Sequence, residues 1–433
     1  MKYLLSKFGC FFILIFSINQ TNAQRIHIND VTNFWKAYDK IQKEQTFDEQ
    51  LKIINADYLK PASNGLKEMC EVMNYTDSGY VNSIIKYPKF WNSLRHKTAS
   101  LAEENEAIYK YLQNLKTLYP NLQPANLYLC FGLGNAGGRP LGRDLVIGLE
   151  LALGDSSINT SEFESQAKKD FYKYAQTGGL AHVAIHEYIH TQQKTINNNY
   201  VLKQSIREGA CDFLSELVLN KELNLNYIKY GYANYYKTLA QFKIDLLKPN
   251  FNDWFYNDKV QTIKDLGYFV GYDISKKYYQ NNIDKAKAIS EIIDLDYTND
   301  QAIFHFLNQS KIFKETLSYQ DELKLFQDQC PTIESIIPLT EDDIINSDTK
   351  KLGIVFTKPM AKGTSIKFSE KGRSYFPFSK IIGFDDNEKI IWLELEIEKN
   401  KEYEFVVTDR GFQSKDGFPL RQKEYIIKFS TEI

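Results

Sequence analysis

Hydrophobic side chains recur at helical spacing through residues 31–119. Phe34, Trp35, Tyr38 and Ile41 fall on one face of such a helix, and residues 101–118 form a long amphipathic stretch with its charged residues outward. Prolines separate these stretches at three positions: Pro61, Pro88 and Pro120. We expect this part of the chain to be a helical scaffold that flanks a cleft.

Two short apolar segments follow and predict strands, at residues 126–133 (NLYLCFGL) and 144–151 (DLVIGLEL). A glycine-rich loop over residues 134–140 joins them. A peptidase commonly holds an extended substrate by adding it to the edge of a sheet, because main-chain pairing needs no particular sequence. Either segment could supply that edge, and we favour 144–151 because it lies nearer in sequence to the helix that follows.

Helical periodicity returns after the second strand. Residues 180–196 are apolar at the helical period and follow a Gly-Gly pair that predicts a tight turn. A second helix is expected from about Lys203 to Asn220, and a third begins at Gly267 and runs to about Tyr279. Residues 284–326 return to a helical pattern and should complete the domain.

The hydrophobic period changes from helical to alternating after Cys330-Pro331. Segments such as 352–356 and 390–397 alternate apolar with polar residues, and turns that contain Asp, Asn or Gly separate them. About seven short strands in roughly a hundred residues are typical of a β-sandwich. We therefore expect a multidomain protein: a mainly α (α+β) domain with a small sheet over residues 24–330, then an all-β sandwich over residues 331–433.

The first 23 residues have the pattern of an export signal, with two lysines, an apolar run from Phe8 to Ile18 and a small residue at Ala23. The apolar run is short for a membrane span, and Cys10 lacks the preceding lipobox of a lipoprotein. We expect cleavage near Ala23, no transmembrane segment in the mature chain, and a periplasmic, cell-surface or extracellular location in a bacterium. The net charge of −2 argues against nucleic acid as a partner, because phosphate binding needs a clustered cationic surface.

The pattern HExxH lies inside the helix expected over residues 180–196. Residues four apart share a helical face, so the imidazoles of His186 and His190 can reach one metal ion while Glu187 stands beside it. Catalytic zinc usually has three protein ligands and one open position, and Glu208 on the following helix can complete the set. Asp212, one turn after Glu208, is placed to orient a ligating histidine. The sequence therefore predicts one zinc ion.

HEYIH followed by REGACD resembles the gluzincin pattern, in which a downstream ExxxD completes HExxH. More narrowly, HEYIHTQQ with REGACDF is similar to a family of bacterial predicted zinc-dependent proteases, some of them related to a gliding-motility lipoprotein. The resemblance implies a zincin-like fold and assigns His186, His190 and Glu208 as metal ligands. It also implies that Glu187 is the general base and that Asp212 orients a ligand histidine.

This resemblance covers roughly residues 127–293, which we take as 126–293 for the core of the site. The chain lacks the downstream catalytic histidine motif of thermolysin-like enzymes and the GxMEN strand of zinc aminopeptidases, so neither specificity is implied. In the C-terminal part, the segments IIPLTEDDI, LGIVFTKPM and IKFST resemble the Ig-like domains often appended to secreted bacterial proteins.

A metallopeptidase also needs groups that bind substrate and stabilise the developing oxyanion. Tyr268 and Tyr272 are the candidate oxyanion donors, although packing against the zinc helix would also explain them. Arg139 and Arg143, in and after the glycine-rich loop, could hold a substrate carboxylate, although they could equally be solvated residues of a flexible turn.

Two further residues near the motif are weighed as ligands. Cys211 lies three positions after Glu208 and could be an auxiliary ligand, but we interpret it as a small buried residue at a helix crossing. His182, one turn before His186, is likewise not assigned as a ligand. With Cys70, Cys130 and Cys330, Cys211 allows three full disulfide connectivities in an oxidising compartment, which the sequence does not rank.

The leading hypothesis is a secreted or periplasmic zinc metallopeptidase that hydrolyses peptide bonds through a zinc-bound water activated by Glu187, with a peptide or protein as substrate. An alternative is a non-catalytic zinc-binding surface or assembly component that acts through its Ig-like domain, which could contact the cell surface or a glycan. Zinc-dependent hydrolysis of a non-peptide amide, such as one in cell-wall material, is a third possibility.

Overall fold

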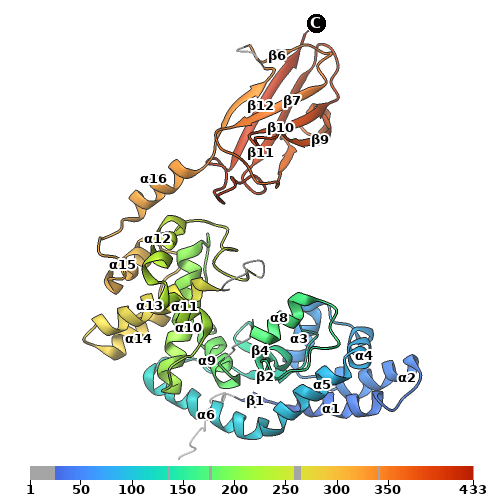
Figure 1. The fold of residues 1–433 in the computed structure, drawn as a ribbon, viewed down its shortest axis with the longest axis vertical. Helices are drawn as coiled ribbons and strands as arrows, with labels where there is room; N and C mark the ends of the chain where they lie inside the picture. Colours follow the sequence, from blue (N-terminus) through green and yellow to red (C-terminus); the bar gives the residue numbers. More distant parts are fainter. Residues whose placement is uncertain (1–24, 135–136, 175–177, 258–264, 340–341, 433) are drawn as a thin grey trace, which may run out of the picture. The chain divides into compact units, whose positions relative to one another are not determined.

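The computed structural model describes residues 25–432, apart from residues 135–136, 175–177, 258–264 and 340–341. The expected export signal lies outside the described residues. The chain divides into two compact units, residues 1–192 and 193–433, which are described in turn (Figure 1). Within the described part, none of the helices combines the length and apolar character needed to cross a bilayer.

Helices dominate the start of the first unit, as the hydrophobic periodicity predicts. They are α1 (Asn29–Ile41), α2 (Phe47–Ile54), α3 (Asn64–Met73), α4 (Asp77–Lys86), α5 (Pro88–Lys97) and α6 (Leu101–Leu118). Ser63 caps α3 by accepting a hydrogen bond from a backbone N–H, and Pro88 occupies the first turn of α5, where its missing N–H costs nothing. The apolar faces meet in an aromatic core in which the Phe34 ring lies 4.8 Å from Trp91 and 4.7 Å from Phe131.

A four-stranded sheet follows, in the order β1-β2-β4-β3. Its strands are β1 (Ile26–His27), β2 (Leu127–Cys130), β3 (Gly138–Leu141) and β4 (Asp144–Gly148). The first two strands and β4 run parallel, whereas β3 pairs antiparallel with β4 after a tight turn at Gly142, where φ is +60°.

Both predicted segments contain a strand, but each strand is shorter than expected: β2 ends at Cys130, and β4 ends at Gly148, where a short helix begins. The preference for residues 144–151 as the edge of the sheet is wrong. Strand β4 lies between β2 and β3, and the two edge strands are β1 and β3; most of β3 lies in the segment that was expected to be a loop. The strand was missed because Gly138 and Pro140 are poor strand formers, although an edge strand tolerates a proline whose missing N–H would face away from the ladder.

Three helices complete the first unit: α7 (Leu149–Ala152), α8 (Gln166–Tyr174) and α9 (Leu180–His190). The last follows Gly178 and Gly179, whose φ angles of +72° and +91° make the tight turn that was expected. It ends at His190 rather than at residue 196, because the chain turns through Thr191 and Gln192 instead of continuing the helix.

The described residues of the second unit begin with helices α10 (Val201–Leu219), α11 (Asn226–Ala233), α12 (Tyr235–Asp245), α13 (Leu266–Asn281), α14 (Lys285–Ile293), α15 (Asp300–Ser310) and α16 (Tyr319–Gln329). The helices predicted near residues 203–220 and 267–279 are thus confirmed. Helices α10 and α13 cross at two glycines. A Cβ on Gly209 would lie 2.0 Å from the backbone nitrogen of Tyr272, and one on Gly271 would lie 1.6 Å from the carbonyl oxygen of Ser205.

The C-terminal part of the second unit is rich in strands, as the alternating pattern predicts. One sheet has the order β5 (Ile333–Ile337), β7 (Lys351–Phe356), β10 (Ile390–Leu395), β9 (Phe378–Phe384); the other has the order β6 (Ile344–Ile345), β12 (Glu424–Thr431), β11 (Glu402–Thr408), β8 (Ile366–Phe368). Alternate residues of both sheets, such as Leu352, Ile391, Phe405 and Phe429, share one hydrophobic core. The four cysteines among the described residues form no disulfide.

Candidate metal centre

Helix α9 carries three histidines on successive turns. The ring centres of His182 and His186 are 5.8 Å apart, and those of His186 and His190 are 4.9 Å apart. The opposite face of the helix holds Tyr188, whose hydroxyl accepts a hydrogen bond from the Ala125 backbone N–H at 2.8 Å. Burial raises the pKa of Tyr188 to about 12. Tyr188 therefore fixes the rotation of the helix relative to the segment that leads into β2.

Glu187 lies against the edge strand β3. A Cβ on Gly138 would approach Cγ and Cδ of Glu187 to 2.4 Å and its Oε1 to 2.5 Å, which is far closer than van der Waals contact. Strand and carboxylate can occupy these positions only because Gly138 has no side chain. The general base expected from the sequence is thus in contact with the edge strand β3.

Helix α10 carries a row of carboxylates at four-residue spacing, each held by a donor from within the second unit. Glu208 accepts a hydrogen bond on Oε1 from Gln204 Nε2 at 2.9 Å, and Asp212 accepts one on Oδ2 from the Tyr227 hydroxyl at 2.6 Å. The side chains of Glu208 and Asp212 are 7% and 0% exposed. Carboxylates this deeply buried need hydrogen bonds or a cation to offset the loss of hydration.

Side chains of α9 and α10 form two groups in which all candidate ligand atoms lie within 4.8 Å of one another. One group is His186, His190 and Cys211, and the other is His182, His186 and Asp212. Imidazole nitrogen, thiolate sulfur and carboxylate oxygen are the ligands that zinc accepts in proteins. The donor chemistry of this largely buried cluster therefore fits a zinc ion, and the cluster could hold a metal.

Among the described residues, neither group contains Glu208, the third ligand expected from the sequence. Glu208 lies three residues before Cys211 and four before Asp212, so it lies one turn before them on the same face of α10. From the sequence, Cys211 is expected to be a packing residue, and His182 is not among the expected ligands. Cys211 is fully buried, which fits packing, but its sulfur also lies within reach of the two imidazoles.

The two expected oxyanion donors lie on α13 in different surroundings. The Tyr272 hydroxyl donates a hydrogen bond to Glu216 Oε2 at 2.7 Å and lies 2.7 Å from Lys276 Nζ. Its hydrogen-bond partners are therefore residues of the second unit. The Tyr268 ring packs against that of Tyr227 in a tilted arrangement, with ring centres 5.6 Å apart. Burial, followed by the negative charge of Glu208, raises the pKa of Tyr268 well above its ordinary value, so its hydroxyl stays protonated and can donate.

Arg139 and Arg143, the expected substrate-binding residues, are both exposed in the segment around β3. The loop that leads into this strand is held by Glu150, a 1% exposed carboxylate that accepts the backbone N–H groups of Gly132 and Gly134, both at 2.9 Å. Burial raises the pKa of Glu150, although these two hydrogen bonds oppose the shift. Glu150 thus fixes the start of the loop that leads to Arg139 and the edge strand β3.

Sequence reasoning missed three residues that shape this region: Gly138, Glu150 and Tyr227. Gly138 belongs to the loop glycines that were expected either to permit close backbone approach or to form a flexible turn, but its contact with Glu187 was not expected. No local pattern marks Glu150 or Tyr227, because each acts through a contact with a distant part of the chain.

No protein-family model and no curated protein sequence matches this chain. Among solved structures, it is similar to the S-layer protein SbsC. A crystal structure of residues 31–844 and one of domains 1–6 each align at 16% identity over 62% of this chain and 38% of that chain, with a TM-score of 0.19. The N-terminal part of SbsC aligns at 16% identity over 61% of this chain and 65% of that chain, also with a TM-score of 0.19. The chain thus spans less than two thirds of each matched structure, and a TM-score of this size does not define a shared fold.

Proposed function

We propose that this protein is an exported bacterial zinc metallopeptidase of gluzincin type. In this proposal, residues 24–330 form a zincin-like catalytic region and residues 331–433 an Ig-like sandwich. His186, His190 and Glu208 hold the zinc ion, and Asp212 orients a ligand histidine. The observation that carries the proposal is the cluster of candidate metal ligands from α9 and α10, together with the contact of Glu187, also on α9, with an edge strand.

The chemistry divides between the metal and the chain. A bound zinc ion supplies Lewis acidity to the substrate carbonyl and makes water easier to deprotonate. Glu187 takes the proton from the attacking water and returns it to the leaving amine, because its carboxylate lies beside the ligand histidines and is only half-buried. The Tyr268 hydroxyl donates to the oxygen that becomes negative during attack, whereas Tyr272 holds Glu216 in place.

Substrate binding is assigned to β3. Among the described strands only β4 pairs with it, so its other side offers main-chain groups to an extended peptide, although Pro140 has no N–H to donate there. An added strand would run beside Glu187, because Gly138 places β3 in contact with that carboxylate. Arg139 lies in β3 and Arg143 in the turn after it; both are exposed, and either could pair with a carboxylate of the substrate.

Replacement of Glu187 by glutamine tests the proposal. The Glu187→Gln variant should bind zinc as the unaltered protein does, because Glu187 is not a ligand, but should lose hydrolysis of a mixed peptide library. The matched control is Glu164→Gln, which removes an exposed carboxylate from the same unit. Undiminished hydrolysis by Glu187→Gln would remove this residue from the mechanism.

Chelation of the unaltered protein completes the test. Cleavage that is abolished by chelator and restored by zinc supports the proposal. Inertness of the zinc-loaded protein toward every peptide would overturn it and favour the alternative, a non-catalytic zinc-binding surface component.

A further inference from the structure

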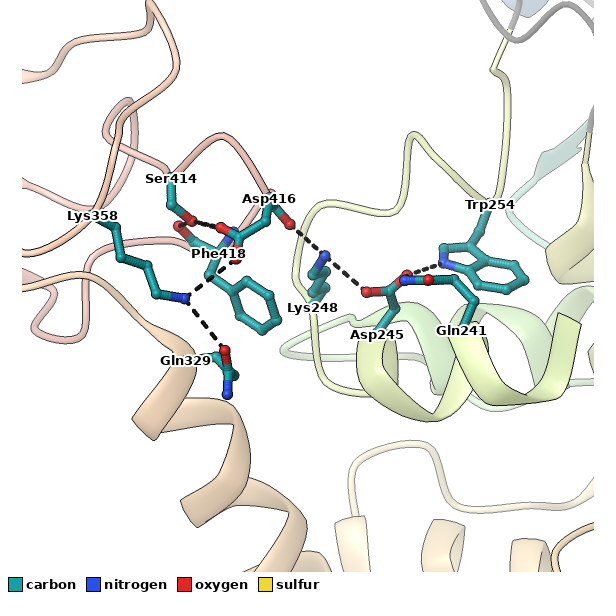
Figure 2. Close-up of polar contacts among 9 residues, drawn as sticks. All are labelled: Gln241, Asp245, Lys248, Trp254, Gln329, Lys358, Ser414, Asp416 and Phe418. Atoms are coloured by element: carbon teal, nitrogen blue, oxygen red, sulfur yellow. Dashed lines mark hydrogen bonds and ion pairs between the residues drawn. The ribbon is translucent and has the colours of Figure 1, made fainter. Parts of the chain in front are cut away.

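Lys248 lies where the helical part of the second unit meets a loop of the C-terminal β region (Figure 2). Its Nζ is 2.8 Å from Asp245 Oδ1, donates to the backbone carbonyl of Asp416 at 2.6 Å and lies 4.3 Å from the centre of the Phe418 ring. Lys248 is only 6% exposed and Asp245 only 3%. We refer to these contacts as the Lys248 joint.

The helical side of the joint is held in place by hydrogen bonds that do not involve Lys248. Asp245 ends α12, and its Oδ2 accepts hydrogen bonds from Trp254 Nε1 and Gln241 Nε2, both at 3.0 Å. Both neighbours hold the carboxylate toward Lys248 (Figure 2). A buried ammonium group is tolerated only where charge and hydrogen bonds replace its lost hydration, so the position of Lys248 is tightly defined.

The β side of the joint is equally constrained. The side chain of Asp416 is held by Ser414 and by Lys358, whose Nζ lies 3.3 Å from Asp416 Oδ2 and 3.3 Å from Gln329 Oε1 at the end of α16. The backbone carbonyl of Asp416 is thereby directed at Lys248. The Phe418 ring packs against the ammonium groups of both Lys248 and Lys358. The β region therefore contributes a carbonyl dipole and an aromatic face to a buried charge.

The backbone of the Lys248 segment caps the helix that carries the carboxylate row. The N–H of Val201 donates to the carbonyl of Lys248, and that of Leu202 donates to the carbonyl of Leu246, both at 3.0 Å. These are among the first N–H groups of α10, which have no partner inside the helix. Tyr200, at the N-cap position, supplies no side-chain cap. The segment therefore takes the place of the side-chain cap that α10 lacks.

We propose that Lys248 is a positioning residue through which the C-terminal β region fixes the first turn of α10. The path runs from the Asp416 carbonyl to the Lys248 ammonium, and from the Lys248 carbonyl to Val201. Glu208 lies two helical turns further along. Where it concerns zinc binding, this inference rests on the proposed function. The β region is then one of the parts of the chain that set the zinc affinity, and not only an appended binding module.

Two glycines of the β region give a matched pair of variants in the full-length protein. Gly417 has φ +84°, and a Cβ there would lie 3.5 Å from Lys248 Nζ. Gly372 has φ +86°, and a Cβ there would meet nothing within 4 Å. Both alanine variants strain a left-handed backbone position, but only Gly417→Ala disturbs the turn that presents the Asp416 carbonyl. Lys248→Met removes the ammonium itself, and Gly417→Ala remains decisive if that variant does not fold.

Two readouts are needed. Hydrogen exchange of the metal-free protein should become about tenfold faster in peptides covering residues 199–206 for Gly417→Ala and Lys248→Met, but not for Gly372→Ala. Zinc affinity should fall by roughly 10- to 100-fold in the same two variants, the usual effect of losing outer support of a metal site, and the visible spectrum of bound cobalt should change with it.

Unchanged exchange in the first turn of α10 would overturn the inference, as would faster exchange confined to residues 413–421. If the unaltered protein binds no zinc, the proposed function fails, while the exchange of metal-free protein still decides whether the β region supports α10.

Discussion

Gly138 gives the sharpest test of how the edge strand and the general base are arranged. An added Cβ at this position would lie 2.4 Å from Cγ and Cδ of Glu187, whereas ordinary contact begins at 3.4 Å, so the carboxylate must move by about 1 Å. Its side chain is flexible and half-buried, which makes the movement inexpensive for folding. A displacement of this size costs a catalytic group about 100-fold in rate, or about 2.7 kcal/mol of transition-state stabilisation.

The assay compares Gly138→Ala with Gly137→Ala, in which the added Cβ would make an ordinary 3.7 Å contact with Leu151. Both variants should bind zinc as the unaltered protein does, and their free energies of unfolding should stay within about 1 kcal/mol of that of the unaltered protein. Only Gly138→Ala should lose about 100-fold in kcat/KM for a peptide substrate, mainly through kcat. Equal activity of the two variants would refute the contact between β3 and Glu187 as the arrangement that sets the position of the base.

Three further predictions follow from buried contacts. Gly271→Ala should destabilise the second unit by about 3 kcal/mol or more, measured by urea unfolding, because its Cβ would collide with a backbone carbonyl 1.6 Å away; unchanged stability would contradict the close crossing of α10 and α13. Tyr227→Phe removes the hydroxyl that donates to Asp212 and should cost about 1.5–3 kcal/mol of stability, with Tyr230→Phe as the control. Burial raises the pKa of Glu150, so the folded state binds its proton more tightly than the unfolded state; stability should fall as pH rises from about 4.5 through the raised pKa, and Glu150→Gln should remove this dependence from unfolding curves recorded across that window.

The sequence was informative where a local pattern determines the structure. The helices containing Phe34, His186 and Glu208 all follow hydrophobic periodicity, and the alternating segments after Cys330 became strands. The HExxH spacing alone is enough to place two imidazoles and Glu187 on a single helix, because four-residue spacing follows from helix geometry.

Features that depend on distant contacts were not predictable. Strand β3 contains a glycine and a proline and is extended only because β4 pairs with it. The neighbours of a side chain on a different helix depend on how the helices pack, so spacing could not distinguish Glu208 from Cys211 as the partner of the histidines. The Lys248 joint links residues 168 positions apart, and no local motif reports such a pair.

The glycine crossing of α10 and α13 has a mechanical consequence. Because backbone meets backbone at Gly209 and Gly271, no side-chain rotamer change can alter the spacing of the two helices at that point. Thermal motion of the surrounding side chains therefore changes the distance between the two helices very little at this point. Glu208 and Tyr272, the immediate neighbours of these glycines, should fluctuate together as parts of one stiff body.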